Sequence, residues 1–123
     1  MATILIADDD QDARSLVQTV LTHAGHRVVE ARDAAEALDY AAIHTPDLIL
    51  LDLSMPGASG PELLRALRAH PATETVAVAL YSATPMNAAL RDFVEMYGVT
   101  GVVPKPSEPL ELIAAVEAAL RRT

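Results

Sequence analysis

Residues 3–10 read Thr-Ile-Leu-Ile-Ala-Asp-Asp-Asp, an apolar run that ends in three acidic residues. The apolar part does not alternate with polar residues, which is typical of a strand buried on both faces of a sheet. Comparable runs recur along the chain, and each is followed by a segment with helical spacing of its apolar residues. This alternation predicts a doubly wound α/β fold, a parallel sheet covered by helices on both faces.

The boundaries of the expected elements follow from capping and turn-forming residues. The expected strands cover residues 3–7, 26–31, 47–51, 76–81 and 101–104. The expected helices cover residues 12–24, 34–44, 61–70, 86–97 and 109–121. The second begins after the capping residue Asp33, the third and fifth begin at proline, and the first four end before glycine or proline. Gly60 is expected to serve backbone geometry at the end of the loop before the third helix.

Helical spacing also predicts which side chains face the core. On the first helix the expected inward residues are Leu16, Val17, Val20 and Leu21. On the last helix they are Leu110, Ile113, Val116, Ala119 and Leu120.

Composition and charge limit the class of protein. The chain has 123 residues, a net charge of −8 and no Cys. This length fits one domain over residues 1–123, with no output domain in this chain. The negative charge argues against direct binding of nucleic acid or of an acidic membrane surface, which need clustered Lys and Arg. No apolar run reaches the ~20 residues that span a bilayer, and acidic residues stand where a signal peptide would be apolar. We therefore expect a soluble, cytoplasmic domain.

Polar and charged residues follow the expected strands. They are Asp8, Asp9 and Asp10 after the first strand, Asp52 after the third, Ser82 after the fourth and Lys105 after the fifth. The carboxyl ends of parallel strands share one edge of the sheet, so these side chains should converge. Two carboxylates ~4 Å apart repel each other by about 4 kcal/mol at an effective dielectric near 20, so the cluster needs a bound proton or a cation. Carboxylate oxygens without His or Cys suit Mg²⁺.

The other strand-end residues suit phosphoryl chemistry. Lys105 can neutralise one carboxylate and donate to a phosphoryl oxygen, and the Ser82 hydroxyl can donate to the same oxygen. The Asp52 carboxylate can attack phosphorus to form an acyl phosphate. A metal ion would shield the negative charges from one another during the transfer.

Four motifs, taken together and in order, resemble those of the response-regulator receiver domain. They are Ile4-Leu-Ile-Ala-Asp8-Asp9-Asp10, Leu48-Ile-Leu-Leu-Asp52-Leu-Ser-Met-Pro56-Gly-Ala-Ser-Gly60, Tyr81-Ser82-Ala83 and Val102-Val-Pro-Lys105-Pro106. The resemblance covers essentially the whole chain. It implies a flavodoxin-like (βα)5 fold with strand order 2-1-3-4-5. It also implies a protein that is not an enzyme, beyond attaching and removing its own phosphoryl group.

The resemblance assigns the phosphoacceptor and the metal ligands. Asp52 would accept a phosphoryl group from a histidine kinase or a histidine phosphotransfer protein. Asp9 would bind Mg²⁺ directly and Asp8 through water, while Asp52 and the backbone carbonyl of Ser54 complete the protein ligands. Ser54 also stands at a position that tunes phosphoryl lifetime in the family. A downstream protein, or the output domain of a longer chain, would read the modification.

The same resemblance assigns the phosphoryl contacts and their neighbours. Ser82 and Lys105 would contact the phosphoryl group, and the Lys105–Pro106 bond would be cis. Ala83 and Thr84 follow Ser82 in the chain. Thr84 stands at a second position that tunes phosphoryl lifetime.

Val102 departs from the family pattern, which has Tyr or Phe three residues before the lysine that follows the fifth strand, here Lys105. In the family that ring swings inward when the Ser or Thr hydroxyl moves toward the phosphoryl group. Valine is small and stiff at χ1, so a large ring motion is impossible at this position. Other residues would then conduct the signal, and Tyr81 and Tyr97 are the nearby candidates.

Three other functions fit these residues less well. A haloacid-dehalogenase-type phosphohydrolase needs a second Asp two residues after its nucleophile, where this chain has Ser54. A flavin-binding module needs a phosphate-cradling loop after the first strand, where residues 8–10 would repel an anion. A receiver-like interaction module that does not use phosphorylation is favoured by Val102 but disfavoured by the complete set of site residues.

Overall fold

The computed structural model describes residues 2–53, 60–83, 87–105 and 107–121, in which strands and helices alternate. The strands are β1 (Thr3–Ala7), β2 (Arg27–Ala31), β3 (Leu48–Leu51), β4 (Val78–Ser82) and β5 (Gly101–Pro104). The helices are α1 (Gln11–His23), α2 (Ala34–His44), α3 (Gly60–Ala69), α4 (Ala88–Tyr97) and α5 (Pro109–Arg121). All expected elements are present, with boundaries within two residues of those expected. The expected first residue of the fourth helix, Met86, lies outside the described residues.

The strands form one parallel sheet in the order β2-β1-β3-β4-β5. This confirms the doubly wound α/β class and the strand order that the family resemblance implied. Pro104 lies on the edge strand β5, where a residue without an N–H does not interrupt a ladder between two neighbours.

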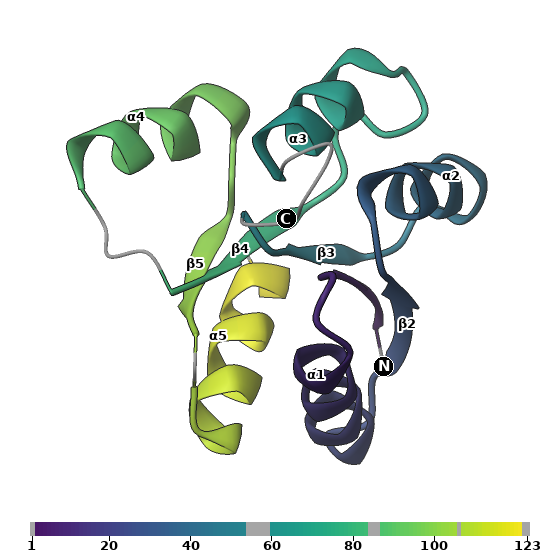
Figure 1. Cartoon of the computed structure of the whole chain (residues 1–123), viewed down its shortest axis with the longest axis vertical. Helices are drawn as coiled ribbons and strands as arrows, with labels where there is room; N and C mark the ends of the chain where they lie inside the picture. Colours follow the sequence, from purple (N-terminus) through teal and green to yellow (C-terminus); the bar gives the residue numbers. More distant parts are fainter. Residues whose placement is uncertain (1, 54–59, 84–86, 106, 122–123) are drawn as a thin grey trace.

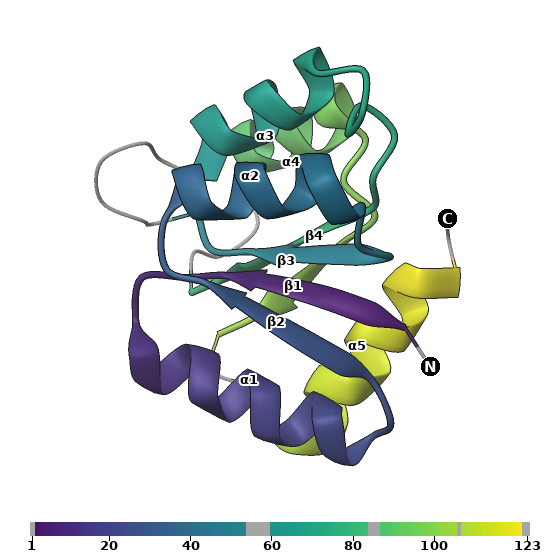
Figure 2. The same cartoon turned by 90° about the vertical axis from the view of Figure 1, so that its right-hand side faces the viewer.

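Helices cover both faces of the sheet (Figures 1 and 2). Helices α1 and α5 lie on one face, and α2, α3 and α4 lie on the other. Alternate residues of each strand point to opposite faces, so the core is divided in two by the sheet. In β1, Ile4 and Ile6 belong to the cluster under α1 and α5, whereas Leu5 and Ala7 belong to the cluster under the other three helices.

Two inward positions were predicted wrongly. Leu16 is 46% exposed and Leu110 is 80% exposed, whereas Leu112, which was not predicted, is 1% exposed. Leu112 and Val116 define the buried stripe of α5. At about 100° per residue, Leu110 lies on the opposite side of the helix from Leu112. None of the described helices has the length and apolar character of a membrane span.

Candidate functional site

The ends of β1 and β3 bring Asp8 and Asp52 together. These strands are neighbours, and Ala7 of β1 pairs with Leu51 of β3, so the next residue of each strand lies at the same edge of the sheet. The N–H of Asp52 donates to the Ala7 carbonyl at 2.9 Å, and the N–H of Asp8 donates to the Ala31 carbonyl at 3.1 Å. Sheet hydrogen bonds therefore hold both backbones beyond the last strand residues.

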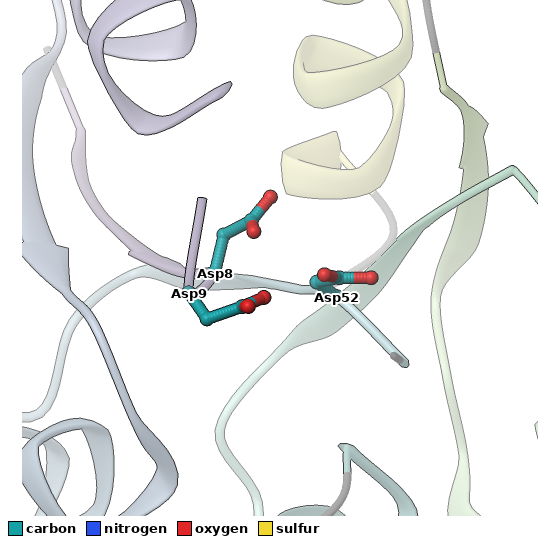
Figure 3. A group of neighbouring side chains, drawn as sticks. All are labelled: Asp8, Asp9 and Asp52. Atoms are coloured by element: carbon teal, nitrogen blue, oxygen red, sulfur yellow. The ribbon is translucent and has the colours of Figure 1, made fainter. Parts of the chain in front are cut away.

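Three carboxylates gather at this edge (Figure 3). Asp8, Asp9 and Asp52 each offer an oxygen, and these oxygens lie within 4.8 Å of one another. Asp8 is fully buried and Asp52 is 5% exposed, whereas Asp9 is exposed. A set of carboxylate oxygens open to water on one side suits Mg²⁺, which keeps several waters and takes few protein ligands. The donor set therefore fits the metal that the sequence predicts.

The ammonium group of Lys105 lies among these acids. Its Nζ donates to Asp8 Oδ2 at 2.8 Å and lies 3.7 Å from Asp52 Oδ2. The backbone N–H of Lys105 donates to the Ser82 carbonyl at 3.0 Å, which extends the β4–β5 pairing to the lysine. Partial burial by itself lowers the pKa of Lys105. The hydrogen bond to Asp8 and the nearby negative charges outweigh burial, so the net pKa is raised. Lys105 is thus held as a cation beside both acids.

Asp10 and Arg14 hold the turn that carries Asp8. The N–H of Asp10 donates to Asp8 Oδ1 at 2.9 Å, and the Asp10 side chain caps α1 by accepting from Asp12 N at 2.9 Å. Arg14 Nη1 donates to the Asp8 carbonyl at 2.8 Å, and Arg14 Nε lies 3.2 Å from Glu30 Oε1. Arg14 was not among the predicted site residues, and its only signal in the sequence is a single basic residue after four acidic ones in residues 8–12.

The other predicted site residues fall into two groups. Ser82 is buried at the end of β4, and its backbone carbonyl accepts from the N–H of Lys105. Ala83, the next residue, is exposed. Ser54, Thr84 and Pro106 lie outside the described residues, as does the expected cis bond at Lys105–Pro106.

Gly60 lies against the backbone that leaves Asp52. A Cβ at position 60 would lie 2.6 Å from the Asp52 carbonyl oxygen and 2.6 Å from Leu53 Cα. Only glycine lets the first residue of α3 approach the backbone after Asp52 this closely. Gly60 therefore serves backbone geometry, as expected, and the reason is a close approach.

The two tyrosines considered for signal conduction lie on opposite faces of the sheet. Tyr81 belongs to the cluster under α1 and α5. Val102 and Tyr97 both pack on the other cluster, under α2, α3 and α4. Tyr97 is also held by Arg65 Nε, which donates to its hydroxyl at 3.1 Å, and by Arg68 Nε, which donates to its carbonyl at 2.8 Å. Of the two candidates, only Tyr97 lies on the same face of the sheet as Val102.

Comparison with known proteins identifies the family. A family model described as the response regulator receiver domain matches residues 4–117. The chain belongs to this family. Response regulators act in two-component signalling, so this receiver domain functions in signal transduction.

Similar proteins agree in sequence and in structure. The chain is 36% identical over 121 residues to the phosphate regulon transcriptional regulatory protein PhoB of Pseudomonas aeruginosa, covering 98% of this chain and 52% of that protein. It is 34% identical over 122 residues to the response regulator ArlR of Staphylococcus aureus, covering 99% and 54%. The receiver chain thus spans about half the length of these curated relatives. Among solved structures, chemotaxis protein CheY4 of Vibrio cholerae has a TM-score of 0.89 at 28% identity, covering 97% of this chain and 98% of that one.

Proposed function

We propose that this receiver domain accepts a phosphoryl group on Asp52, with Mg²⁺ held by Asp8, Asp9, Asp52 and the Ser54 carbonyl. The donor would be a histidine kinase or a histidine phosphotransfer protein. The observation that carries the proposal is the position of the Lys105 ammonium, 2.8 Å from Asp8 and 3.7 Å from Asp52, next to a three-carboxylate cluster.

Each residue has a defined part in the transfer. An Asp52 oxygen attacks phosphorus, an O–P bond forms, and the P–N bond of the phosphohistidine breaks with its electron pair left on the imidazole. Mg²⁺, when bound, neutralises phosphoryl oxygens that would otherwise repel the nucleophile. Lys105 and the Ser82 hydroxyl donate to the phosphoryl oxygens. Lys105 already lies beside Asp52, so it needs little movement to meet the new negative charge.

The proposed output is a change in binding to a partner protein. Phosphorylation adds negative charge at the ends of β3, β4 and β5, where Lys105 and Ser82 are joined through their backbones. A shift of these residues would reach the strand that carries Val102. The partner would be a separate target protein or an output domain of a longer chain, and the site of action would be the cytoplasm.

Intact-mass analysis tests the phosphoacceptor. The protein incubated with acetyl phosphate or phosphoramidate and Mg²⁺ should gain one phosphoryl group, and Asp52→Asn should gain none. Asp47→Asn is the matched control, because Asp47 is exposed and its carboxylate accepts from the Thr3 N–H before β1 and β3 begin to pair. An adduct that persists in Asp52→Asn, or no adduct on the wild type, would overturn the assignment. Turnover of added phosphate esters would instead favour a phosphohydrolase.

A magnesium titration followed by NMR tests the metal ligands. Asp9→Ala should abolish the Mg²⁺-dependent shifts at residues 8–10 and 52. Asp12→Ala is the matched control, since Asp12 is an exposed acid in the first turn of α1 and is not part of the cluster. Equal Mg²⁺ affinity in Asp9→Ala and the wild type would refute the role of Asp9.

A further inference from the structure

The ring of Tyr81 lies under the ammonium of Lys105. Lys105 Nζ is 5.3 Å from the centroid of the Tyr81 ring. This distance is within the range of about 6 Å in which a cation is attracted to the face of an aromatic ring. Tyr81 is 2% exposed and packs in the cluster under α1 and α5. The ring is therefore a fixed surface, held by the core on one side and facing a cation on another.

The sheet explains why these two side chains meet. Tyr81 of β4 pairs with Val103 of β5, and both belong to the cluster under α1 and α5. Lys105 is two residues beyond Val103, and residues two apart in an extended chain point to the same face. The lysine side chain thus starts on the face that holds Tyr81 and then passes the ring to reach Asp8 and Asp52.

We propose that Tyr81 is a positioning residue of the phosphoryl site, whose ring face holds the Lys105 ammonium between Asp8 and Asp52. The proposal rests on the proposed function, because it assigns Lys105 to the phosphoryl group. The lysine side chain has four methylene groups and many rotamers. A second contact besides the hydrogen bond to Asp8 is therefore needed to keep the ammonium group in one position. Asp8 pulls the ammonium from one side, and the ring limits its movement on another. This role is separate from signal conduction, since Tyr81 and Val102 lie on opposite faces of the sheet.

Substitutions at position 81 separate the ring from the hydroxyl. Tyr81→Phe keeps the ring and should phosphorylate with acetyl phosphate at close to the wild-type rate. Tyr81→Leu removes the ring and should slow phosphorylation roughly tenfold, the size expected for a partly desolvated cation–π contact. A slow Tyr81→Phe, or a Tyr81→Leu that matches the wild type, would overturn the proposal.

A double-mutant cycle shows whether Tyr81 acts through Lys105. If it does, Tyr81→Leu should cause no further loss of rate in a Lys105→Ala background. Full additivity of the two losses would mean that the ring acts elsewhere, and the proposal would fail. Should Tyr81→Leu not fold, fluorinated phenylalanine at position 81 replaces it, because fluorine weakens the negative ring face without removing the ring. That variant should then phosphorylate more slowly than Tyr81→Phe, and equal rates would count against the proposal.

An NMR measurement tests the positioning role without any phosphorylation. The ring current of Tyr81 should shift the Lys105 ε-methylene protons upfield, and the shift should persist in Tyr81→Phe and disappear in Tyr81→Leu. If the wild type is not phosphorylated but the ring-current shift is present, the proposed function fails while the contact stands. If phosphorylation occurs on Asp52 and the shift is absent from the wild type, the positioning role fails and the proposed function stands.

Discussion

Lys105 and Arg68 are partly buried cations at opposite ends of the sheet, and they have different partners. Lys105 follows β5 and contacts the carboxylates of Asp8 and Asp52. Arg68 lies where β4 and β5 begin, and its guanidinium donates to three backbone carbonyls. These are the carbonyls of Val76 at 2.7 Å, Tyr97 at 2.8 Å and Glu74 at 3.3 Å.

The two environments shift the pKa values of these cations in opposite directions. Burial lowers the pKa of the Arg68 guanidinium. Burial also acts to lower the pKa of Lys105, but the hydrogen bond to Asp8 and the charges of Asp8 and Asp52 reverse the net shift. Backbone carbonyls satisfy hydrogen bonds, but they carry no net charge to offset the cation. One end of the sheet therefore has a cation, Arg68, that binds uncharged backbone carbonyls. The other end has a cation, Lys105, beside two carboxylates, and phosphorylation of Asp52 would change the charge around it.

The largest expected effect is loss of stability in Arg68→Ala. The substitution removes three hydrogen bonds from a charged donor, so the free energy of unfolding should fall by about 3 kcal/mol. Chemical denaturation measures this change. Arg65→Ala is the control, because Arg65 donates an exposed hydrogen bond to the Tyr97 hydroxyl, and its loss should lower the free energy of unfolding by less than about 1 kcal/mol. Phosphorylation of the folded Arg68→Ala protein should be retained, and its loss would break the distinction between the two ends.

The second-largest expected effect is a loss of stability on substitution of Gly60, compared with Gly101 at the other end of the sheet. Gly60→Ala should lower the free energy of unfolding by about 2 kcal/mol, because its Cβ would overlap the backbone of Asp52 and Leu53. Gly101→Ala at the start of β5 is the matched control, since the atom nearest its added Cβ is the Ala119 Cβ at 4.0 Å. Alanine there should be neutral or slightly stabilising. Thermal unfolding of both variants measures the difference, and equal losses would contradict the close approach seen at Gly60.

A smaller effect tests charge repulsion at the site. In the absence of divalent metal, Asp9→Asn should raise the free energy of unfolding by about 1 kcal/mol, because it removes one of three clustered negative charges. Added Mg²⁺ should raise the stability of the wild type in proportion to its binding, and that of Asp9→Asn much less. Denaturation with EDTA and with Mg²⁺ provides the comparison. Identical responses to Mg²⁺ would mean that the cluster does not bind the ion.

The smallest effect is confined to alkaline pH. The pKa of Tyr81 is raised chiefly by burial, and that of Lys105 is raised in net despite burial. Both groups hold their protons more tightly in the folded state than in the unfolded state. Their contribution to stability is therefore complete at neutral pH and is lost as the pH rises above about 10. In Lys105→Arg the side chain keeps its charge throughout this range, so the alkaline loss measured by denaturation should be shallower than in the wild type. An unchanged slope would contradict the raised pKa of Lys105.

Much of the fold and part of the site were predictable because they depend on local patterns. Apolar runs, capping residues and helix-breaking residues predicted the boundaries of every element to within two residues. These signals depend on residues close together in the chain. The convergence of Asp8, Asp9 and Asp52 was predictable because parallel strands share one carboxyl edge. Leu16 flanks the buried stripe of α1, and spacing alone does not say how wide that stripe is. Leu110 was wrong for another reason, because the buried stripe of α5 runs through Leu112 and Val116 and leaves Leu110 on the opposite side of the helix.

Contacts between distant residues could not be predicted in this way. Arg14 reaches the Asp8 carbonyl and Glu30, and Arg68 reaches the carbonyls of Val76 and Tyr97. Long cationic side chains can extend in many directions, and only the packed neighbours select one.

The order of the buried strands, the helices between them and the chemical groups that follow each strand depend on local sequence alone. These properties are carried by residues close together in the chain. The position of Lys105, bonded to Asp8, over the ring of Tyr81 and near Asp52, depends instead on how distant strands pack. The physical reason is that the crossover helices set which strands become neighbours and which face each side chain takes. A flexible lysine takes one position only when groups from several of those strands surround it.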